Sequence, residues 1–255
     1  MFVDTHTHYD DSRFSEDQEE MLSSLVKEGV DWLVNISANL RSAKTTLALT
    51  QRYPFVYGAL GVHPDEVYTL DEEKISWIKE YLSDPKILAV GEIGLDYYRE
   101  HDKNKQKYWF DYQLDLARQS KLPVVIHSRD AHQDTYAILK TNEAQDIGGV
   151  IHCFSYSKEC AKQYLDLGFF LGIGGVLTFK NAKNLKEVVR YAPLEQLVLE
   201  TDCPYLAPDP HRGERNDSRY LHYIAKAIAE LKNLSVEDVC QVTSENAKRL
   251  YQRQG

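Results

Sequence analysis

The stretch PVVIHSRDAHQDTYAILKTN (123–142) joins a short apolar run to a longer segment whose apolar residues have helical spacing. The apolar run is followed at once by His127, and the helical segment begins near Ala131. A buried strand followed by an amphipathic helix is the repeating unit of proteins in which helices cover a parallel sheet. This stretch therefore predicts an α/β fold.

The same pairing of an apolar run with a helical pattern recurs along the whole chain. The apolar runs begin near Phe2, Trp32, Phe55, Ile87, Pro123, Gly149, Phe169 and Leu197. The helical patterns span 16–29, 41–53, 71–84, 103–121, 131–142, 157–168 and 182–191, and the final segment, 218–253, predicts two helices. Eight units of this kind favour a closed TIM-type (β/α)8 barrel over an open, doubly wound sheet.

Three residues are predicted to mark helix ends. Ser15 is expected to cap the first helix and Gly29 to end it. Asp71, which two glutamates follow, is expected to open the helix over 71–84.

The bulk composition sets limits on the fold and on the partners. The 255 residues match the roughly 250 of one TIM barrel, so a single domain over 1–255 is expected. A net charge of −9 disfavours broad binding to nucleic acid, and phosphate must be attracted locally. The four cysteines include no CxxC pair, and neither a signal peptide nor a long apolar span is visible. We expect a cytoplasmic monomer with no obligate protein partner and no membrane association.

The first chemical signal is His6-Thr7-His8 at the end of the first predicted strand. Side chains two positions apart on a strand lie on the same side, so the two imidazoles suit one divalent cation. The alternative is a pair of unrelated surface histidines.

Potential ligands recur where other predicted strands end. These are Glu92 in ILAVGEIG, His127 in PVVIHS, His152 in GVIHCF and Asp202 in LVLETD. In a TIM barrel the carboxyl ends of all strands meet at one face, where active sites lie. Residues far apart in sequence are therefore predicted to form a metal site.

Six ligands exceed what one catalytic zinc takes, and they predict two cations that share a carboxylate. Glu92 is the candidate bridge, with His6, His8 and Asp202 on one cation and His127 and His152 on the other. Imidazole ligands favour Zn, Ni, Co, Mn or Fe over Ca, and Mg stays open.

Seven motifs along the chain resemble the TatD family of the amidohydrolase superfamily. They are DTHTHYD (4–10), GVHPDE (61–66), VGEIGLDYY (90–98), VVIHSRDA (124–131), IHCFSYS (151–157), ETDCPYLAP (200–208) and HRGERND (211–217). The resemblance implies a barrel, a divalent-metal-dependent deoxyribonuclease, and metal ligands at the six positions above. It also implies that Asp202 accepts the proton of the attacking water.

Two positions depart from the family pattern. Tyr156 stands where the family has glycine, and Asn216-Asp217-Ser218 stands where it often has Asn-Glu-Pro. Both are expected near the substrate mouth, where they affect substrate preference and leave the metal centre unchanged.

Other polar residues are candidates for contacts with substrate. His63, Arg129 and Arg212 are predicted to bind phosphate; the alternatives are a loop imidazole for His63 and surface ion pairs for the arginines. Tyr97 and Tyr98 either stack on a base or pack at the barrel mouth.

Asp4 and Glu200 share the predicted faces of His6 and Asp202, respectively. Each is expected to orient a ligand imidazole, or else to pair with a buried lysine or arginine.

The predicted function is hydrolysis of phosphodiester bonds, in an exonuclease-like manner, at DNA ends or in a small phosphodiester. One alternative is an amide or lactone hydrolase, which is disfavoured because Glu92 stands where many such enzymes use a carboxylated lysine. An aminoacyl-tRNA deacylase would use the same metal centre. A non-catalytic binding protein is disfavoured because all six candidate ligands are present.

Overall fold

Eight strands form one sheet in the computed structural model, which describes residues 1–99 and 101–252. The strands follow sequence order around the sheet, and each pairs in parallel with the next. They are β1 (Phe2–Thr7), β2 (Val30–Ile36), β3 (Val56–Leu60), β4 (Ile87–Asp96), β5 (Val124–Arg129), β6 (Gly149–Ile151), β7 (Phe170–Ile173) and β8 (Leu197–Leu199).

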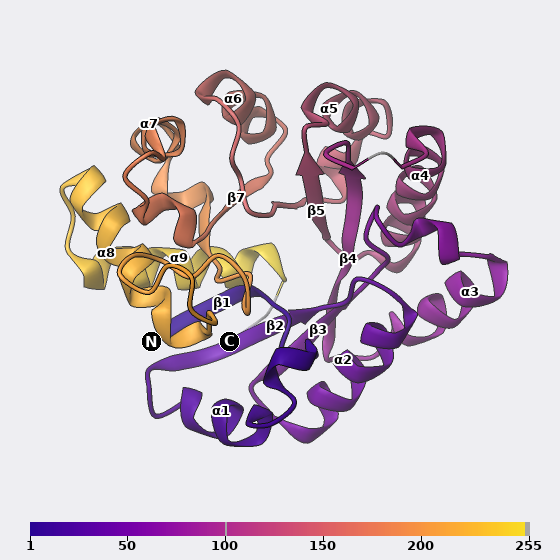
Figure 1. Ribbon diagram of the computed structural model, residues 1–255. Helices are drawn as coiled ribbons and strands as arrows, with labels where there is room; N and C mark the ends of the chain where they lie inside the picture. Colours follow the sequence, from indigo (N-terminus) through magenta and orange to yellow (C-terminus); the bar gives the residue numbers. More distant parts are fainter. Residues whose placement is uncertain (100, 253–255) are drawn as a thin grey trace.

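Helices follow the strands and surround the sheet (Figure 1). They are α1 (Gln18–Leu25), α2 (Leu40–Arg52), α3 (Glu72–Tyr81), α4 (Lys103–Ser120), α5 (His132–Thr141), α6 (Lys158–Asp166), α7 (Lys183–Tyr191), α8 (Leu221–Lys232) and α9 (Val236–Leu250). The predicted alternation is confirmed, as are the two final helices. The fold is a TIM-type (β/α)8 barrel.

The barrel closes between its first and last strands through the segment that follows β8. Thr7 forms a parallel bridge with Cys203, and the His8 N–H donates to the Cys203 carbonyl at 2.8 Å. The Asp202 N–H donates to the His6 carbonyl at 3.0 Å. Closure at this end places Asp202 beside the two histidines of β1.

The capping contacts confirm the predicted helix end at Asp71 and correct the one at Ser15. The Asp71 side chain accepts from the Lys74 N–H and caps α3, as predicted. Ser15 does not cap α1: its own N–H bonds to the Ser12 carbonyl in a short 3-10 turn, and α1 begins only at Gln18. The helical spacing of 16–29 extends through this turn, which apolar spacing alone does not separate from the helix.

Gly29 does not directly end α1, because the helix stops at Leu25. It follows a turn in which its N–H donates to the Val26 carbonyl at 3.3 Å. Its φ of +90° suits glycine at the approach to β2.

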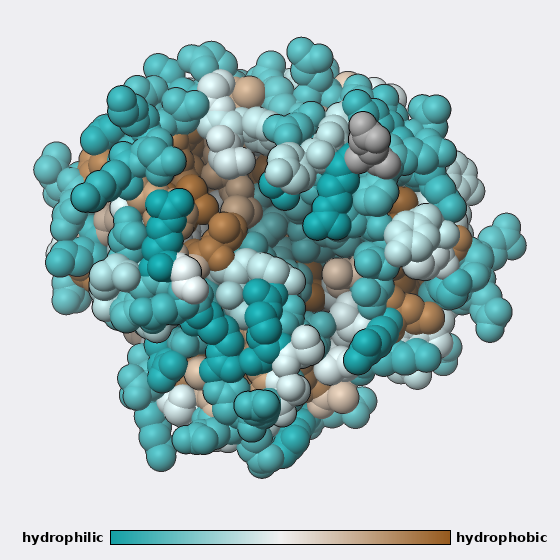
Figure 2. All heavy atoms as spheres, in the orientation of Figure 1, coloured by the Kyte–Doolittle hydropathy of each residue, from teal (hydrophilic) through white to brown (hydrophobic). Residues whose placement is uncertain are grey.

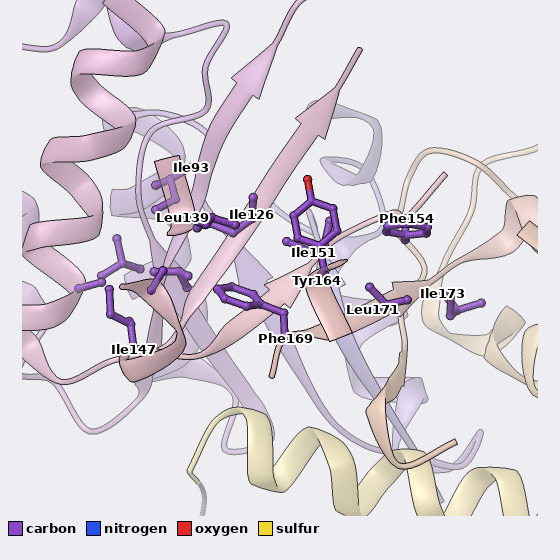
Figure 3. Packing of buried hydrophobic residues seen from close by; sticks show 14 of the residues in the cluster. Ile93, Ile126, Leu139, Ile147, Ile151, Phe154, Tyr164, Phe169, Leu171 and Ile173 are labelled. Carbon is purple, nitrogen blue, oxygen red and sulfur yellow. The ribbon is translucent and has the colours of Figure 1, made fainter. Parts of the chain in front are cut away.

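Clusters of buried apolar residues stabilise the barrel. Between the strands and the outer helices lies a large cluster, part of which Figure 3 shows around Ile126, Ile151 and Phe169. A second cluster combines Trp32 and other strand residues with Leu250 and Tyr251 at the end of α9. The Tyr251 hydroxyl donates to the Thr5 carbonyl at 2.8 Å, so this end of α9 is attached to β1.

The outer surface agrees with the charged composition. Figure 2 shows a largely hydrophilic face on which hydrophobic side chains appear mainly in recesses. Within 1–99 and 101–252, no helix has the length and apolar character needed to cross a bilayer.

Candidate metal centre

The six side chains predicted as ligands come together at the C-terminal ends of five strands. His6 lies in β1 and His8 directly after it, Glu92 in β4, His127 in β5, His152 directly after β6, and Asp202 after β8. His6, Glu92 and His152 are buried, and the other three are partly buried. Strand order alone brings these residues to one face, because parallel strands of a barrel end on the same side.

Glu92 lies at the centre of the cluster. Its Oε2 atom is 3.5 Å from His6 Nε2 and 3.8 Å from His8 Nε2. Its Oε1 atom is 2.8 Å from His127 Nδ1 and 3.3 Å from His152 Nε2. The two oxygens of one carboxylate therefore face two different pairs of imidazoles.

Asp202 completes the group on the β1 side. Its Oδ1 atom is 3.4 Å from His8 Nε2 and 3.7 Å from His6 Nε2, and those two nitrogens are 3.1 Å apart. The His6 ring also stacks on the His152 ring at 3.7 Å between centroids. Three sets of donor atoms lie close enough to hold an ion: His6, His8 and Glu92; His6, His152 and Asp202; and His63, Glu92 and His127.

For His127 and His8, a contact on the far side of the ring determines which nitrogen faces the cluster. His127 Nε2 lies 2.9 Å from Asp96 Oδ2, and His8 Nδ1 lies 2.9 Å from the Ile36 carbonyl. Both partners accept only, so each of these nitrogens carries the proton in a neutral ring. When such a ring gives up its second proton, the opposite nitrogen, which in His127 is the Nδ1 atom 2.8 Å from Glu92 Oε1, would offer a lone pair to a cation.

His152 has a comparable contact with Glu200. Its Nδ1 atom lies 3.2 Å from Glu200 Oε1, which is within ion-pair distance, although the two atoms do not form a hydrogen bond. Glu200 Oε1 also accepts from the Cys153 N–H at 2.6 Å, which holds the carboxylate in place. Glu200 therefore lies where it orients a candidate ligand, as the sequence suggested.

The family model described as "TatD related DNase" matches residues 3–252 of this chain. This chain belongs to that family. It is 41% identical over 252 residues to the uncharacterized metal-dependent hydrolase YabD of Bacillus subtilis, covering 98% of this chain and 99% of YabD. It is 35% identical to the uncharacterized metal-dependent hydrolase YcfH of Escherichia coli K12, covering 98% and 95%.

A solved structure agrees with this assignment. The crystal structure of the TatD homologue YjjV from Escherichia coli K12 superposes with a TM-score of 0.94 at 30% identity, covering 99% of this chain and 98% of that one. With this family and this barrel, the chain is a metal-dependent hydrolase.

The residues of the TatD-family cluster fit a divalent cation in their donor chemistry. Imidazole nitrogens and carboxylate oxygens are the ligands that zinc and related metals take. Burial raises the pKa of the Glu92 carboxyl, but the charge of His152 and hydrogen bonds from His127 and His6 outweigh burial and hold this pKa well below its ordinary value. The cluster therefore keeps a buried negative charge that a cation can balance.

Neighbouring carboxylates favour positive charge on two of the imidazoles, those of His8 and His127. Burial lowers the pKa of His8, but Asp202 and Glu92 outweigh it and raise that pKa to about 10. Burial likewise opposes protonation of His127, while Asp96 and Glu92 raise its pKa to about 9. The site thus stabilises cations electrostatically.

His63 reaches the same cluster from the loop after β3. Its Nε2 atom is 3.8 Å from Glu92 Oε1, and its Nδ1 atom accepts from the Asp65 N–H at 3.1 Å. Burial lowers the pKa of His63 to about 3, so the ring is neutral and its proton is on Nε2. His63 is therefore arranged as a hydrogen-bond donor.

Above the cluster lies a cleft of about 390 Å³. His8, His63, Glu92, His127, His152 and Asp202 line it, together with acidic residues and Arg99. Arg99 lies 3.5 Å from Asp65 and is the cation that reasoning from sequence missed. It follows Tyr97 and Tyr98 in the loop after β4, and only this loop's path shows that it reaches the cleft.

The two arginines predicted to bind phosphate lie outside the residues that line this cleft. The Arg129 guanidinium stacks on the Tyr98 ring at 3.7 Å, and that of Arg212 stacks on Phe179 at 4.3 Å. Neither forms an ion pair among residues 1–99 and 101–252. The surface ion pairs considered as alternatives are therefore not what holds them.

Asp96 was not singled out in the sequence, although its contact with His127 orients that ring. The available signal was its spacing, because Asp96 lies four residues after Glu92 on the same strand and so on the same side.

The expectation for Asp4 was wrong. Its carboxylate accepts from the Thr201 N–H, the Thr201 hydroxyl and the Ser218 hydroxyl at 2.7–2.9 Å. No ligand imidazole, lysine or arginine side chain bonds to it among the described residues. The β1–β2 pairing shifts register between Asp4 and Thr7, so simple alternation along β1 does not hold there.

Tyr97 packs against the hydrophobic core, and its hydroxyl donates to Asp134 at 2.6 Å. Tyr98 is exposed.

The two departures from the family pattern lie outside the lining of the cleft. The Tyr156 hydroxyl lies 3.0 Å from Ser128 Oγ and accepts from the Ala131 N–H, which fixes the loop after β5. Asn216, Asp217 and Ser218 are buried, and Ser218 donates to Asp4. None of these residues is among those that line the cleft, in contrast to the expected position at the mouth.

Proposed function

We propose that this TatD-family hydrolase is a deoxyribonuclease that cleaves phosphodiester bonds at single-stranded DNA ends with two divalent cations. The division of donor atoms by Glu92 is the observation that carries the proposal. Oε2 lies with His6 and His8, and Oε1 lies with His127 and His152. A carboxylate arranged in this way suits a bridge between neighbouring cations.

His6, His8 and Asp202 would hold one cation, and His127 and His152 the other, with Glu92 shared. Bound divalent cations would activate a water molecule and offset the negative charge of the phosphate. Zn, Mn, Mg, Ni and Co all suit these ligands in kind.

The protein's own groups supply positioning and proton transfer. Asp202 faces the cleft, and its pKa is kept low because hydrogen bonding to His8 and the nearby imidazoles outweigh burial. It is therefore an ionised carboxylate able to accept the proton of the attacking water. His63 points its Nε2–H into the same space and can donate to a phosphate oxygen.

Three arginines are candidates for phosphate contacts around this centre. Arg99 lines the cleft, whereas Arg129 and Arg212 would meet phosphates farther along the strand. A guanidinium stacked on an aromatic ring is held in position while its N–H groups stay available.

A single-stranded end or a small phosphodiester fits this site better than a duplex does. The net charge of −9 does not favour a continuous phosphate backbone, and the cleft of about 390 Å³ has the size of a small-molecule site. The chain is expected to act without an obligate protein partner.

The decisive experiment measures nucleotide release from end-labelled single-stranded DNA. Metal-depleted protein is assayed with Mg, Mn, Zn or no metal restored, beside Glu92→Gln and the exposed control Glu159→Gln. We expect release that depends on metal, is lost in Glu92→Gln, and is unchanged in Glu159→Gln.

Each other outcome has a distinct meaning. If Glu92→Gln turns over like the wild type, the bridging role is wrong. If two bound ions are measured but no metal restores release, the nuclease assignment fails and ester substrates such as aminoacyl-tRNA are tested next.

A further inference from the structure

Tyr205 forms one wall of the cleft beside the metal-binding cluster. Its ring centroid is 6.2 Å from that of His8, and the two rings meet edge to face. Although it lines the cleft, 45% of its surface is exposed. This ring takes no part in the metal binding, proton transfer or phosphate contacts proposed for the cleft.

The backbone of Tyr205 is tied to the metal-binding segment. Its N–H donates to the Asp202 carbonyl at 2.9 Å, and its carbonyl accepts from Asn216 Nδ2 at 2.7 Å. Asn216 is fully buried and donates also to the Thr201 carbonyl at 2.8 Å. The motif HRGERND thus fixes Tyr205 relative to Asp202 through Asn216.

A second set of contacts fixes the ring itself. The Arg13 guanidinium lies over it at 4.0 Å, and Asp11 accepts from both Arg13 and the Tyr205 hydroxyl. Arg13 therefore covers one face of the ring, which lines the cleft and keeps 45% of the residue exposed. A rigid ring with one free side loses little conformational entropy when a flat ligand stacks on it.

The charge of this group distinguishes it from the pair formed by Arg129 and Tyr98. Asp11 neutralises Arg13 through a two-point ion pair, whereas Arg129 has no carboxylate partner among the described residues. The group of Tyr205 therefore attracts an aromatic ring more than a phosphate. The acidic lining of the cleft, which includes Asp10, Asp11 and Asp65, supports the same distinction.

We propose that Tyr205 is a stacking platform for a nucleobase of single-stranded DNA, next to the phosphodiester that is cleaved. This inference rests on the proposed function and adds the subsite that receives the base. Stacking on an aromatic side chain accepts every base, because each base has a π-face. The platform therefore gives affinity for a strand end without sequence preference.

The test uses a probe that reports stacking directly. A short single-stranded oligonucleotide carries 2-aminopurine at its end and phosphorothioate terminal linkages that slow cleavage, and it is titrated with Mn-loaded enzyme. We expect quenching of the 2-aminopurine fluorescence by the wild type and by Tyr205→Phe, and a loss of this quenching in Tyr205→Ala. Tyr112→Ala serves as the matched control, because Tyr112 is 40% exposed and lies in α4, outside the residues that line the cleft.

Kinetics on a cleavable strand give a second readout. Tyr205→Ala should raise KM roughly 5- to 150-fold with little change in kcat. The KM of Tyr205→Phe should stay close to that of the wild type. On a strand with abasic terminal nucleotides, wild type and Tyr205→Ala should differ by less than about threefold, since no base is left to stack. An equal loss on both substrates, or a loss in Tyr205→Phe as large as that in Tyr205→Ala, overturns the platform.

The two proposals fail in different ways. If the wild type quenches the probe through Tyr205 but releases no nucleotide with any metal, the nuclease proposal fails and the platform holds. If it releases nucleotides but quenching does not depend on Tyr205, the platform fails and the nuclease proposal holds.

Discussion

Asp96 and Glu200 act on the candidate metal centre through the imidazoles that they contact. Asp96 lies 2.9 Å from His127 Nε2, and Glu200 lies 3.2 Å from His152 Nδ1. In both cases the carboxylate faces the nitrogen that points away from Glu92. Such partners fix the tautomer and the orientation of a ligand ring, and they raise its basicity.

Removing either carboxylate charge should weaken metal binding. We expect Asp96→Asn and Glu200→Gln each to lower the affinity for Zn or Mn by about 10- to 100-fold, measured by competition with a chromophoric chelator. Asp134→Asn is the control, because Asp134 bonds to Tyr97 and Lys107 away from the cluster. Unchanged affinity in both variants would show that the imidazoles are held by other contacts.

His132 offers a test of pH dependence away from the metal centre. Its Nε2 lies 2.8 Å from Gln163 Oε1 and its Nδ1 lies 3.0 Å from the Tyr164 hydroxyl, so the neutral ring donates once and accepts once. Burial lowers the pKa of His132 despite the bond to Gln163. When the pH falls below the ordinary pKa of histidine, His132 therefore binds a proton in the unfolded chain but stays neutral in the folded chain until the pH is lower.

This contribution to stability should be present above pH 6.5 and decline as the pH falls toward the lowered pKa of the folded state. Wild type and His132→Gln should accordingly differ more in free energy of unfolding at about pH 7.5 than at about pH 5.5. Urea unfolding at both pH values measures the difference, and parallel behaviour of the two proteins would refute the assignment.

The pairing of β4 with β5 depends on a glycine. Gly94 is opposite His127 in the ladder and has a φ of +138°. A Cβ atom there would lie 2.0 Å from the His127 carbonyl oxygen. The two strands can therefore approach closely only without a side chain at this position.

Gly94→Ala should consequently destabilise the protein by about 3 kcal/mol or more and weaken metal binding, because His127 must move with its strand. Gly29→Ala is the matched control: Gly29 also has positive φ, but a Cβ there meets nothing within 4 Å. We expect a cost of only about 1 kcal/mol at Gly29. Denaturant unfolding compares the two, and equal costs would mean that backbone strain alone decides.

For the molecule as a whole, the candidate metal ligands lie on or shortly after five strands of the barrel, including the first and the last. An ion bound only by the folded chain stabilises it by about 2.7 kcal/mol at a free concentration of 100 times Kd. For a protein of this size, that corresponds to a rise in Tm of roughly 5 to 10 °C.

Thermal unfolding of metal-depleted protein with and without added Mn or Zn tests this linkage. The rise in Tm should be largely lost in Glu92→Gln, because Glu92 contacts imidazoles on both sides of the cluster. It should persist in Glu159→Gln, which changes an exposed helix residue. An equal rise in Glu92→Gln would mean that the stabilising ion binds elsewhere.

The sequence by itself determined the barrel and the convergence of the six candidate ligands. Apolar runs and helical spacing are local patterns, and eight alternating units admit few other folds. Because parallel strands of a barrel end at one face, a polar residue at the end of each run could be placed without knowing its neighbours. Glu92 and His152 were assigned in this way.

Only the tertiary structure decided how each side chain is oriented and what it contacts. Asp4 bonds to Thr201, 197 positions away, and Tyr205 is held by Asn216 and Asp11 from different loops. Such contacts depend on register shifts and loop paths, which no local pattern encodes. For the same reason the cleft presents Arg99, and the orientations of the candidate ligands His127 and His8 follow from Asp96 and the Ile36 carbonyl.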